Sequence, residues 1–139
     1  MNNILLVEDD YLDAMNVQRQ LSKANIAHTL KVARNGKEAL NLLQGQTGER
    51  MNPLPDVILL DINMPKMNGL EFLKEIRDDS DLRRLKVFIM TTSNEEAERS
   101  QAQRLGISGY IIKPLSFDNF DQKQSSMDNF NLLCDLLKN

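Results

Sequence analysis

Acidic side chains follow two apolar runs of this sequence. Glu8, Asp9 and Asp10 come directly after the first run, and Asp61 comes directly after a later one. Carboxylates gathered in one place repel one another, which raises their pKa values unless a cation compensates. An all-oxygen set without histidine or thiolate suits Mg²⁺ or Mn²⁺ better than zinc. If the chain folds so that these acids meet, we therefore expect a divalent cation among them.

Hydroxyl and lysine side chains follow two further apolar runs. One run ends on the triplet Thr91-Thr92-Ser93, and the next ends on Lys113. A lysine charge suits a phosphoryl group and a threonine supplies a hydroxyl donor. Together with the acids and a metal, these residues predict phosphoryl transfer onto an aspartate carboxylate, with an acyl phosphate as product. Each residue alone also fits an ordinary strand-end cap, so the prediction depends on their lying together.

Strands and helices must alternate to position these residues. Continuous apolar runs at 4–7, 57–60, 87–90 and 109–112 predict buried strands, and the alternating stretch 29–33 predicts an edge strand. Amphipathic segments between them predict helices. We therefore expect an α/β fold, a (βα)5 doubly wound five-stranded parallel sheet of flavodoxin-like strand order 2-1-3-4-5 with helices on both faces. The carboxyl ends of such strands share one edge, which brings the polar residues together.

The helices are expected to differ in how firmly they are anchored. The segment 95–105 is polar almost all round, which makes it a candidate for movement. The final segment, 117–137, is predicted to be helical. The helical positions expected to face the core are Ala14, Val17, Leu21, Ala24, Ala39, Leu42, Leu43, Leu70, Leu73, Ile76, Ala97, Ala102 and Leu105.

Length and composition exclude several classes of protein. The 139 residues predict one domain, 1–139, with an extended C-terminal helix at 117–137. A net charge of -3 argues against direct DNA binding. The first residues lack a basic start and a small-residue cleavage site, so no signal peptide is expected, and no apolar run approaches membrane-span length. The single cysteine, Cys134, is expected in the core, and cysteine usage predicts a cytoplasmic location. The single histidine, His28, is expected to be structural or solvent-facing.

Four motifs in fixed order resemble the receiver domain of two-component response regulators, over essentially the whole chain. The long Gly45–Pro55 loop, the hydroxyl triplet and the C-terminal helical extension are similar to stand-alone regulators paired with phytochrome-type histidine kinases. The four motifs are Leu5-Leu6-Val7-Glu8-Asp9-Asp10, Leu60-Asp61-Ile62-Asn63-Met64-Pro65-Lys66-Met67-Asn68-Gly69, Met90-Thr91-Thr92-Ser93 and Tyr110-Ile111-Ile112-Lys113-Pro114.

The resemblance implies a role for each acid. Asp61 would accept a phosphoryl group from the phosphohistidine of a histidine kinase and would also bind the metal. Asp9 would bind Mg²⁺ (or Mn²⁺) directly, Glu8 would act through a water, and the backbone carbonyl of Asn63 would complete the protein ligands. Asp10 aligns just past the usual acidic pair, so it is left out of the metal shell.

The resemblance also implies a switch. Lys113 would pair with the phosphoryl oxygens, Thr91 would turn its hydroxyl toward the phosphoryl group, and Tyr110 would move inward behind it. A half-buried Tyr110 with its hydroxyl in water is the alternative. Thr92 departs from the family, which usually has a small residue there, and could narrow access for phosphodonors.

The resulting prediction is a stand-alone response regulator of a bacterial two-component phosphorelay. It is a phosphoprotein that assists only its own phosphorylation and dephosphorylation, and not an enzyme. Its output would be a contact with a downstream protein, made by the surface of 95–105, 109–112 and the final helix. A homodimer interface is a hypothesis, and a monomer in which the same side chains cap the sheet is the alternative. The side chains concerned are Phe120, Met127, Phe130 and Leu133.

Other functions stay open to different degrees. A phosphorelay intermediate, which passes the phosphoryl group from Asp61 to a histidine phosphotransfer protein, has the same sequence features. A receiver that binds partners constitutively is disfavoured because the whole acid, hydroxyl and lysine set is present. An aspartyl-phosphate phosphohydrolase would want a second acid where Asn63 stands. A flavin or dinucleotide binder would need a Gly-rich loop after the first strand, and this chain has none there.

Overall fold

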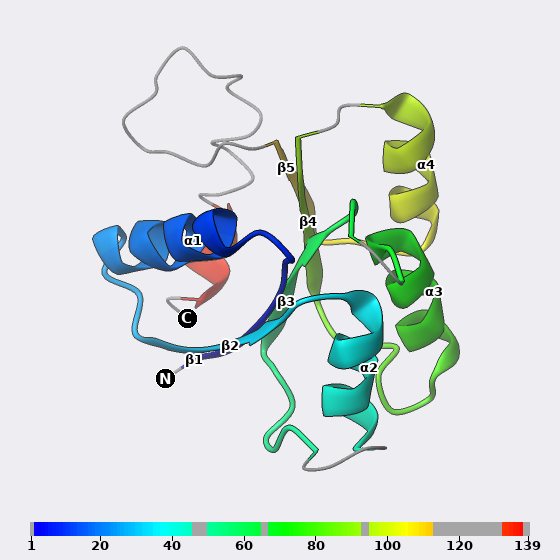
Figure 1. Ribbon diagram of the computed structural model, residues 1–139, viewed down its shortest axis with the longest axis horizontal. Helices are drawn as coiled ribbons and strands as arrows, with labels where there is room; N and C mark the ends of the chain where they lie inside the picture. Colours follow the sequence, from blue (N-terminus) through cyan, green and yellow to red (C-terminus); the bar gives the residue numbers. More distant parts are fainter. Residues whose placement is uncertain (1, 46–49, 65–66, 93–94, 113–131, 138–139) are drawn as a thin grey trace.

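Five parallel strands form one sheet in the order β2-β1-β3-β4-β5 (Figure 1). The computed structural model describes residues 2–45, 50–64, 67–92, 95–112 and 132–137. The predicted α/β class and strand order are confirmed, and β2 lies at an edge as expected. The strands are β1 (Asn2–Val7), β2 (His28–Ala33), β3 (Val57–Asp61), β4 (Val87–Thr91) and β5 (Gly109–Ile112).

Helices cover both faces of the sheet, as predicted. Helices α2, α3 and α4 pack on one face, and α1 packs on the other beside the helical residues 132–137 (Figure 1). Successive strand residues serve opposite faces, so Leu5 and Val7 belong to one core cluster and Ile4 and Leu6 to the other. The four helices are α1 (Tyr11–Lys23), α2 (Gly36–Gln44), α3 (Gly69–Asp78) and α4 (Glu96–Arg104).

Two of the three core positions expected in each of α2 and α3 are buried, namely Ala39, Leu43, Leu73 and Ile76, and one position in each helix differs. Leu40 is buried in place of Leu42, and Phe72 in place of Leu70. Both helices begin with a buried glycine and bury positions 1, 4, 5 and 8 counted from it, which is the i, i+3, i+4, i+7 pattern of one helix face. Leu42 and Leu70 lie at the margin of that face and are partly buried.

The buried residues of helices α1 and α4 also differ from those expected. In α1, Gln20 is buried beside the expected apolar residues, while Ala24 is the C-cap and only partly buried. In α4, only Ala102 is buried; Ala97 is exposed and Leu105 is half-buried. The expectation that α4 is weakly anchored is therefore met with even less apolar burial than the sequence suggested.

The single cysteine lies inside the core, and the single histidine lies away from the carboxyl edge of the sheet. Cys134 is buried in the cluster on the α1 face, which confirms its packing role. His28 begins β2, at the opposite end of the sheet from the acids, with its Nδ1 2.7 Å from the carbonyl oxygen of Ile26. Among the described residues, none of the helices is long and apolar enough to cross a membrane.

Candidate functional site

Three carboxylates meet at the carboxyl edge of the sheet. Strands β1 and β3 pair in parallel with Val7 opposite Leu60, so the next residue on each strand, Glu8 and Asp61, comes to the same place. Asp9 follows on the loop. One carboxylate oxygen from each of the three acids lies within 4.8 Å of the others. The sequence-based expectation that Glu8, Asp9 and Asp61 lie together is therefore met.

The burial of this acid cluster favours a cation. Glu8 is 2% exposed and Asp61 is 7% exposed, while Asp9 is open to solvent. Burying carboxylates beside one another is costly unless positive charge compensates. The donors are all oxygens, and the cluster contains no imidazole or thiolate. This donor set fits a hard divalent ion of the Mg²⁺ or Mn²⁺ type and leaves one open, water-accessible side at Asp9.

The third acid of the run has a different job. Asp10 is the N-cap of α1, and its Oδ1 accepts hydrogen bonds from the backbone N–H groups of Leu12 at 2.9 Å and Asp13 at 3.2 Å. Such a cap satisfies donors that the first turn of a helix leaves open. Asp10 thus fixes the start of α1 directly after the metal-binding candidates.

The loop after β3 is held against the backbone of Asp61. Oδ1 of Asp61 accepts a hydrogen bond from the N–H of Asn63 at 3.4 Å, and the N–H of Gly69 donates to the carbonyl of Ile62 at 2.9 Å. A Cβ at Gly69 would collide with the backbone oxygen of Asp61 and lie 2.8 Å from the Cα of Ile62. Only glycine therefore lets α3 begin this close to the acid.

Helix α3 and helix α2 fix the same loop from two sides. Asn68 and Glu71 form a capping box, with the Asn68 side chain accepting from the Glu71 N–H at 2.9 Å and the Glu71 carboxylate accepting from the Asn68 N–H at 3.1 Å. From α2, the N–H of Gly36 donates to the carbonyl of Met67 at 3.1 Å. The described part of the loop that begins at Asp61 is thus tied to two helices.

The hydroxyl and aromatic candidates lie on the next two strands. Thr91 is the last residue of β4 and is fully buried, one residue beyond the partner of Asp61, Met90. Tyr110 lies on β5 and is 4% exposed, so its ring is inside the protein. The Cζ atom of Arg99 lies 5.2 Å from the centroid of that ring.

The surroundings of Tyr110 affect its ionisation. Burial raises the pKa of the Tyr110 phenol above 10.0, the carboxylates of Glu98 and Glu95 raise the pKa further, and the guanidinium of Arg99 opposes them. Within the described part of the chain, these three charges all come from helix α4, counting its N-cap residue.

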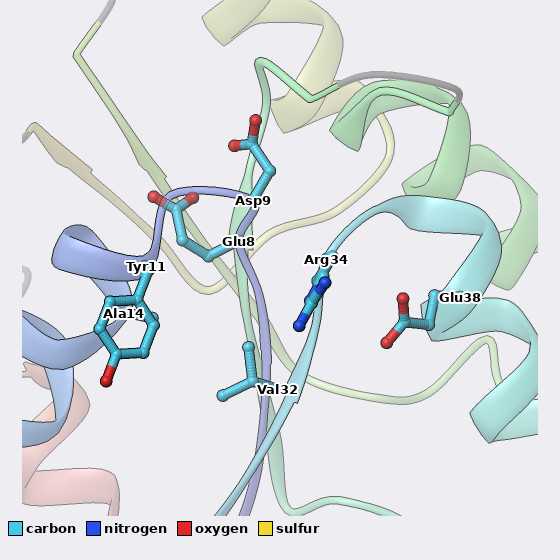
Figure 2. A pocket seen from close by; sticks show the side chains of 7 residues that line it. All are labelled: Glu8, Asp9, Tyr11, Ala14, Val32, Arg34 and Glu38. Carbon is cyan, nitrogen blue, oxygen red and sulfur yellow. The ribbon is translucent and has the colours of Figure 1, made fainter.

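A pocket of about 580 Å³ adjoins the acid cluster and was not expected from the sequence (Figure 2). Tyr11 and Ala14 form its α1 side, and residues from β2 to the start of α2 form the other side. Arg34 directly follows a strand, as the acids do, so the strand-end rule applied to β2 could have found it. The lining residues are Glu8, Asp9, Tyr11, Ala14, Val32, Arg34 and Glu38.

Several predicted residues lie outside the described residues. They are Ser93, Lys113, Phe120, Met127 and Phe130. Leu133, which was grouped with the last three, is fully buried in the core cluster on the α1 face. That is the position expected for it in a monomer. The roles proposed for the residues outside the described part of the chain stay predictions.

Proteins similar to this chain include response regulators. Response regulator Rcp1 of Synechocystis sp. is 35% identical over 127 residues, which cover 91% of this chain and 86% of Rcp1. Its solved structure in the Mn²⁺-bound form has a TM-score of 0.75 at 33% identity and covers 98% of this chain and 91% of that one. The phosphorylated cyanobacterial phytochrome response regulator RcpA has a TM-score of 0.77 at 35% identity, with 94% of both chains covered.

The family profile described as the response regulator receiver domain matches residues 4–124, which include the acid cluster, strands β2 to β5 and all of β1 except its first two residues. That match agrees with the strand order and with the meeting of three acids at the carboxyl edge of the sheet. The chain belongs to the response regulator receiver domain family of two-component systems.

Proposed function

We propose that Asp61 accepts a phosphoryl group from the phosphohistidine of a histidine kinase. The observation that supports this most is the acid cluster, because it places a nearly buried carboxylate beside two others within 4.8 Å. A carboxylate oxygen of Asp61 attacks the phosphorus atom and forms a P–O bond. The P–N bond to the histidine breaks, and the imidazole leaves with that electron pair. The product is an aspartyl phosphate.

The acids would hold the cation that this chemistry requires. Asp9, Asp61 and the backbone carbonyl of Asn63 would bind Mg²⁺ or Mn²⁺ directly, and Glu8 would act through a water. When bound, the ion supplies positive charge that offsets the repulsion between carboxylates and phosphoryl oxygens. The hard, all-oxygen donor set supports this assignment, and the Mn²⁺-bound structure of Rcp1 is a relative with such an ion.

The response would be a change of surface. Thr91 would bind the phosphoryl group through its hydroxyl and Lys113 through its ammonium, and Tyr110 would report the change to α4 and β5. The buried positions of Thr91 and Tyr110 support a coupled rearrangement. The receiver would act as a stand-alone regulator in the cytoplasm, without direct DNA binding, by contact with a downstream protein. A homodimer would be the second assembly to test. The phytochrome response regulator RcpA supports a phytochrome-type kinase as donor.

Intact-mass measurement after incubation with acetyl phosphate and Mg²⁺ tests the proposal. We expect one phosphoryl adduct in the wild type, none in Asp61→Asn and none in the presence of EDTA. An adduct that persists in Asp61→Asn would contradict the assignment of the acceptor. If the wild type takes up no phosphoryl group, the variant Thr92→Ala is tested next. An adduct in this variant would mean that Thr92 narrows the access of phosphodonors to Asp61. No adduct in this variant would mean that the receiver does not accept phosphoryl groups.

A further inference from the structure

Helix α4 packs on the sheet with very little apolar surface. Ala102 is its one buried residue, and Leu105, the C-cap, packs against the core only in part. Helix α3 on the same face buries Phe72, Leu73 and Ile76. An alanine methyl buries far less area than these side chains, so polar contacts must carry more of the attachment of α4.

Arg77 joins the C-terminal end of α4 to α3. From the last turn of α3, its Nε donates to the carbonyl of Leu105 at 2.8 Å and its Nη2 donates to the carbonyl of Gly106 at 2.6 Å. Its Nη1 donates to the carbonyls of Arg83 and Leu85, both at 2.9 Å. One planar guanidinium therefore connects α3, the segment before β4 and the turn after α4 through four backbone carbonyls.

Burial and geometry make this connection specific to arginine. Arg77 is half-buried, and this burial lowers the pKa of its guanidinium from the usual value. A lysine has three donors on one atom, so it cannot serve four carbonyls spread over two segments. Gly106 adopts a φ of 82°, and this turn exposes its carbonyl to Nη2.

Arg99 makes a different contact in the N-terminal half of α4. Its guanidinium lies over the Tyr110 ring, with 5.2 Å between Cζ and the ring centroid, and this is a cation–π contact. Charges of Glu95 and Glu98 also act on Tyr110 from the same half of the helix. The position of this half is therefore linked to a side chain on β5, whereas the backbone carbonyls at the other end are held by the Arg77 side chain of α3.

We propose that α4 pivots about its C-terminal end, which Arg77 fixes, and that the contact between Arg99 and Tyr110 is the releasable tie on its N-terminal half. Arg77 and Arg99 are positioning residues in this scheme. A move of the Tyr110 ring removes the cation–π contact of Arg99 and leaves the four hydrogen bonds of Arg77 in place. The link from this pivot to signalling rests on the proposed function, but the pivot itself does not.

Amide hydrogen exchange measured by NMR on the full chain tests the pivot without any phosphodonor. One reporter is the amide of residue 99, which donates to the carbonyl of Glu95, and the other is the amide of Leu105, which donates to Gln101 and Ala102. We expect Arg99→Met to raise exchange at residue 99 by about two- to fivefold, as loss of a cation–π contact implies, and to leave Leu105 as in wild type. Equal increases at both amides, or no change at either, would overturn the pivot.

Variants of the second arginine and a control complete the test. Arg77→Met is expected to raise exchange at Leu105 as well as at residue 99; an unchanged Leu105 would overturn the fixed end. If Arg77→Met does not fold, Arg77→Lys replaces it, and a rise at Leu105 is again required. Arg99→Lys keeps a cation for the ring and should restore most of the protection at residue 99. Arg104→Met removes an exposed charge from the same helix and should change neither reporter.

The signalling link is tested separately with acetyl phosphate and Mg²⁺. In protein whose mass shows the adduct, the change in exchange should occur at residue 99 and spare Leu105. An equal change at Leu105 in the phosphorylated protein would overturn the pivot as the route of the response. An adduct that is absent from both the wild type and Thr92→Ala would overturn the proposed function alone, because the comparison of the arginine variants needs no phosphoryl group.

Discussion

Helices α3 and α4 are neighbours on one face of the sheet and nearly equal in length, 10 and 9 residues, but they are held there in different ways. Helix α3 has a capping box at its start and three large apolar side chains in the core. Helix α4 buries one alanine and depends on two arginines. Burial of large side chains fixes a helix in one position, whereas a few polar contacts can be exchanged.

This difference matches what each helix adjoins. Helix α3 begins against the backbone of Asp61, where a shift would move the acid cluster. Helix α4 lies over Tyr110, at the surface proposed to change on phosphorylation. The molecule thus combines a rigid support for the chemistry with a loosely held element at the proposed output surface.

The largest expected effect is the difference in unfolding free energy between truncating a buried side chain of α3 and truncating one of α4. Phe72→Ala should lower the free energy of unfolding by about 3–5 kcal/mol, because it leaves a cavity beneath α3. The corresponding truncation in α4, Ala102→Gly, should cost only about 1 kcal/mol, mostly through backbone entropy. Urea denaturation measures both. The comparison breaks if the α4 change costs as much as the α3 change.

The next effect tests the contact of α3 with the acid. Gly69→Ala places a methyl group against the backbone of Asp61 and Ile62, so we expect a loss of about 1–3 kcal/mol and slower phosphorylation of Asp61 by acetyl phosphate. Gly106→Ala is the matched control: its φ of 82° makes alanine unfavourable, but its nearest non-local heavy atom, on Arg77, is 3.9 Å away and it lies far from the acids in the chain. The idea fails if both variants phosphorylate at the same rate as wild type.

A smaller effect concerns the capping box. Asn68→Ala removes the acceptor for the Glu71 N–H and should cost about 1 kcal/mol in unfolding free energy. Asn68→Ser retains a capping oxygen and should cost only a few tenths of a kcal/mol. Thermal or urea unfolding of the two variants gives the difference. Equal stabilities would mean that apolar packing alone fixes the start of α3.

The smallest effect is a pH dependence at the α4 face. The pKa of Tyr110 is raised above 10.0 in the folded protein, so the folded state keeps a proton that the unfolded state loses first. The resulting stabilisation is complete below pH 10.0 and is lost as the pH rises through the folded-state pKa. Urea midpoints on either side of that pH should fall less steeply in Tyr110→Phe than in wild type. Tyr11→Phe, at an exposed tyrosine, should behave as wild type.

The strands and their polar ends could be predicted from the sequence because each buried strand of a parallel sheet is a continuous apolar run. Val57–Leu60 is such a run, and the residue that ends it, Asp61, reaches the acid cluster as expected. The faces of the helices were less predictable. Leu70 and Phe72 are both apolar, and the choice between them depends on where Gly69 approaches the β3 backbone, which is a tertiary feature.

The two arginines carry no signal in the sequence. A basic residue near the end of a helix, such as Arg77, is ordinary because it suits the helix dipole. Its acceptors are backbone carbonyls, which every residue has, so no pattern of side chains marks them. Arg99 likewise resembles any solvated charge until β5 brings Tyr110 beneath it.

The three carboxylates come from β1 and β3, which adjoin each other in the sheet but are separated along the chain by α1, β2 and α2. The acids cannot approach within 4.8 Å until these two strands have paired, so the cluster does not exist in the unfolded chain. A divalent ion held by the cluster would bind the native state alone and would stabilise it by mass action. The concentration of that ion would then enter the folding equilibrium of the protein.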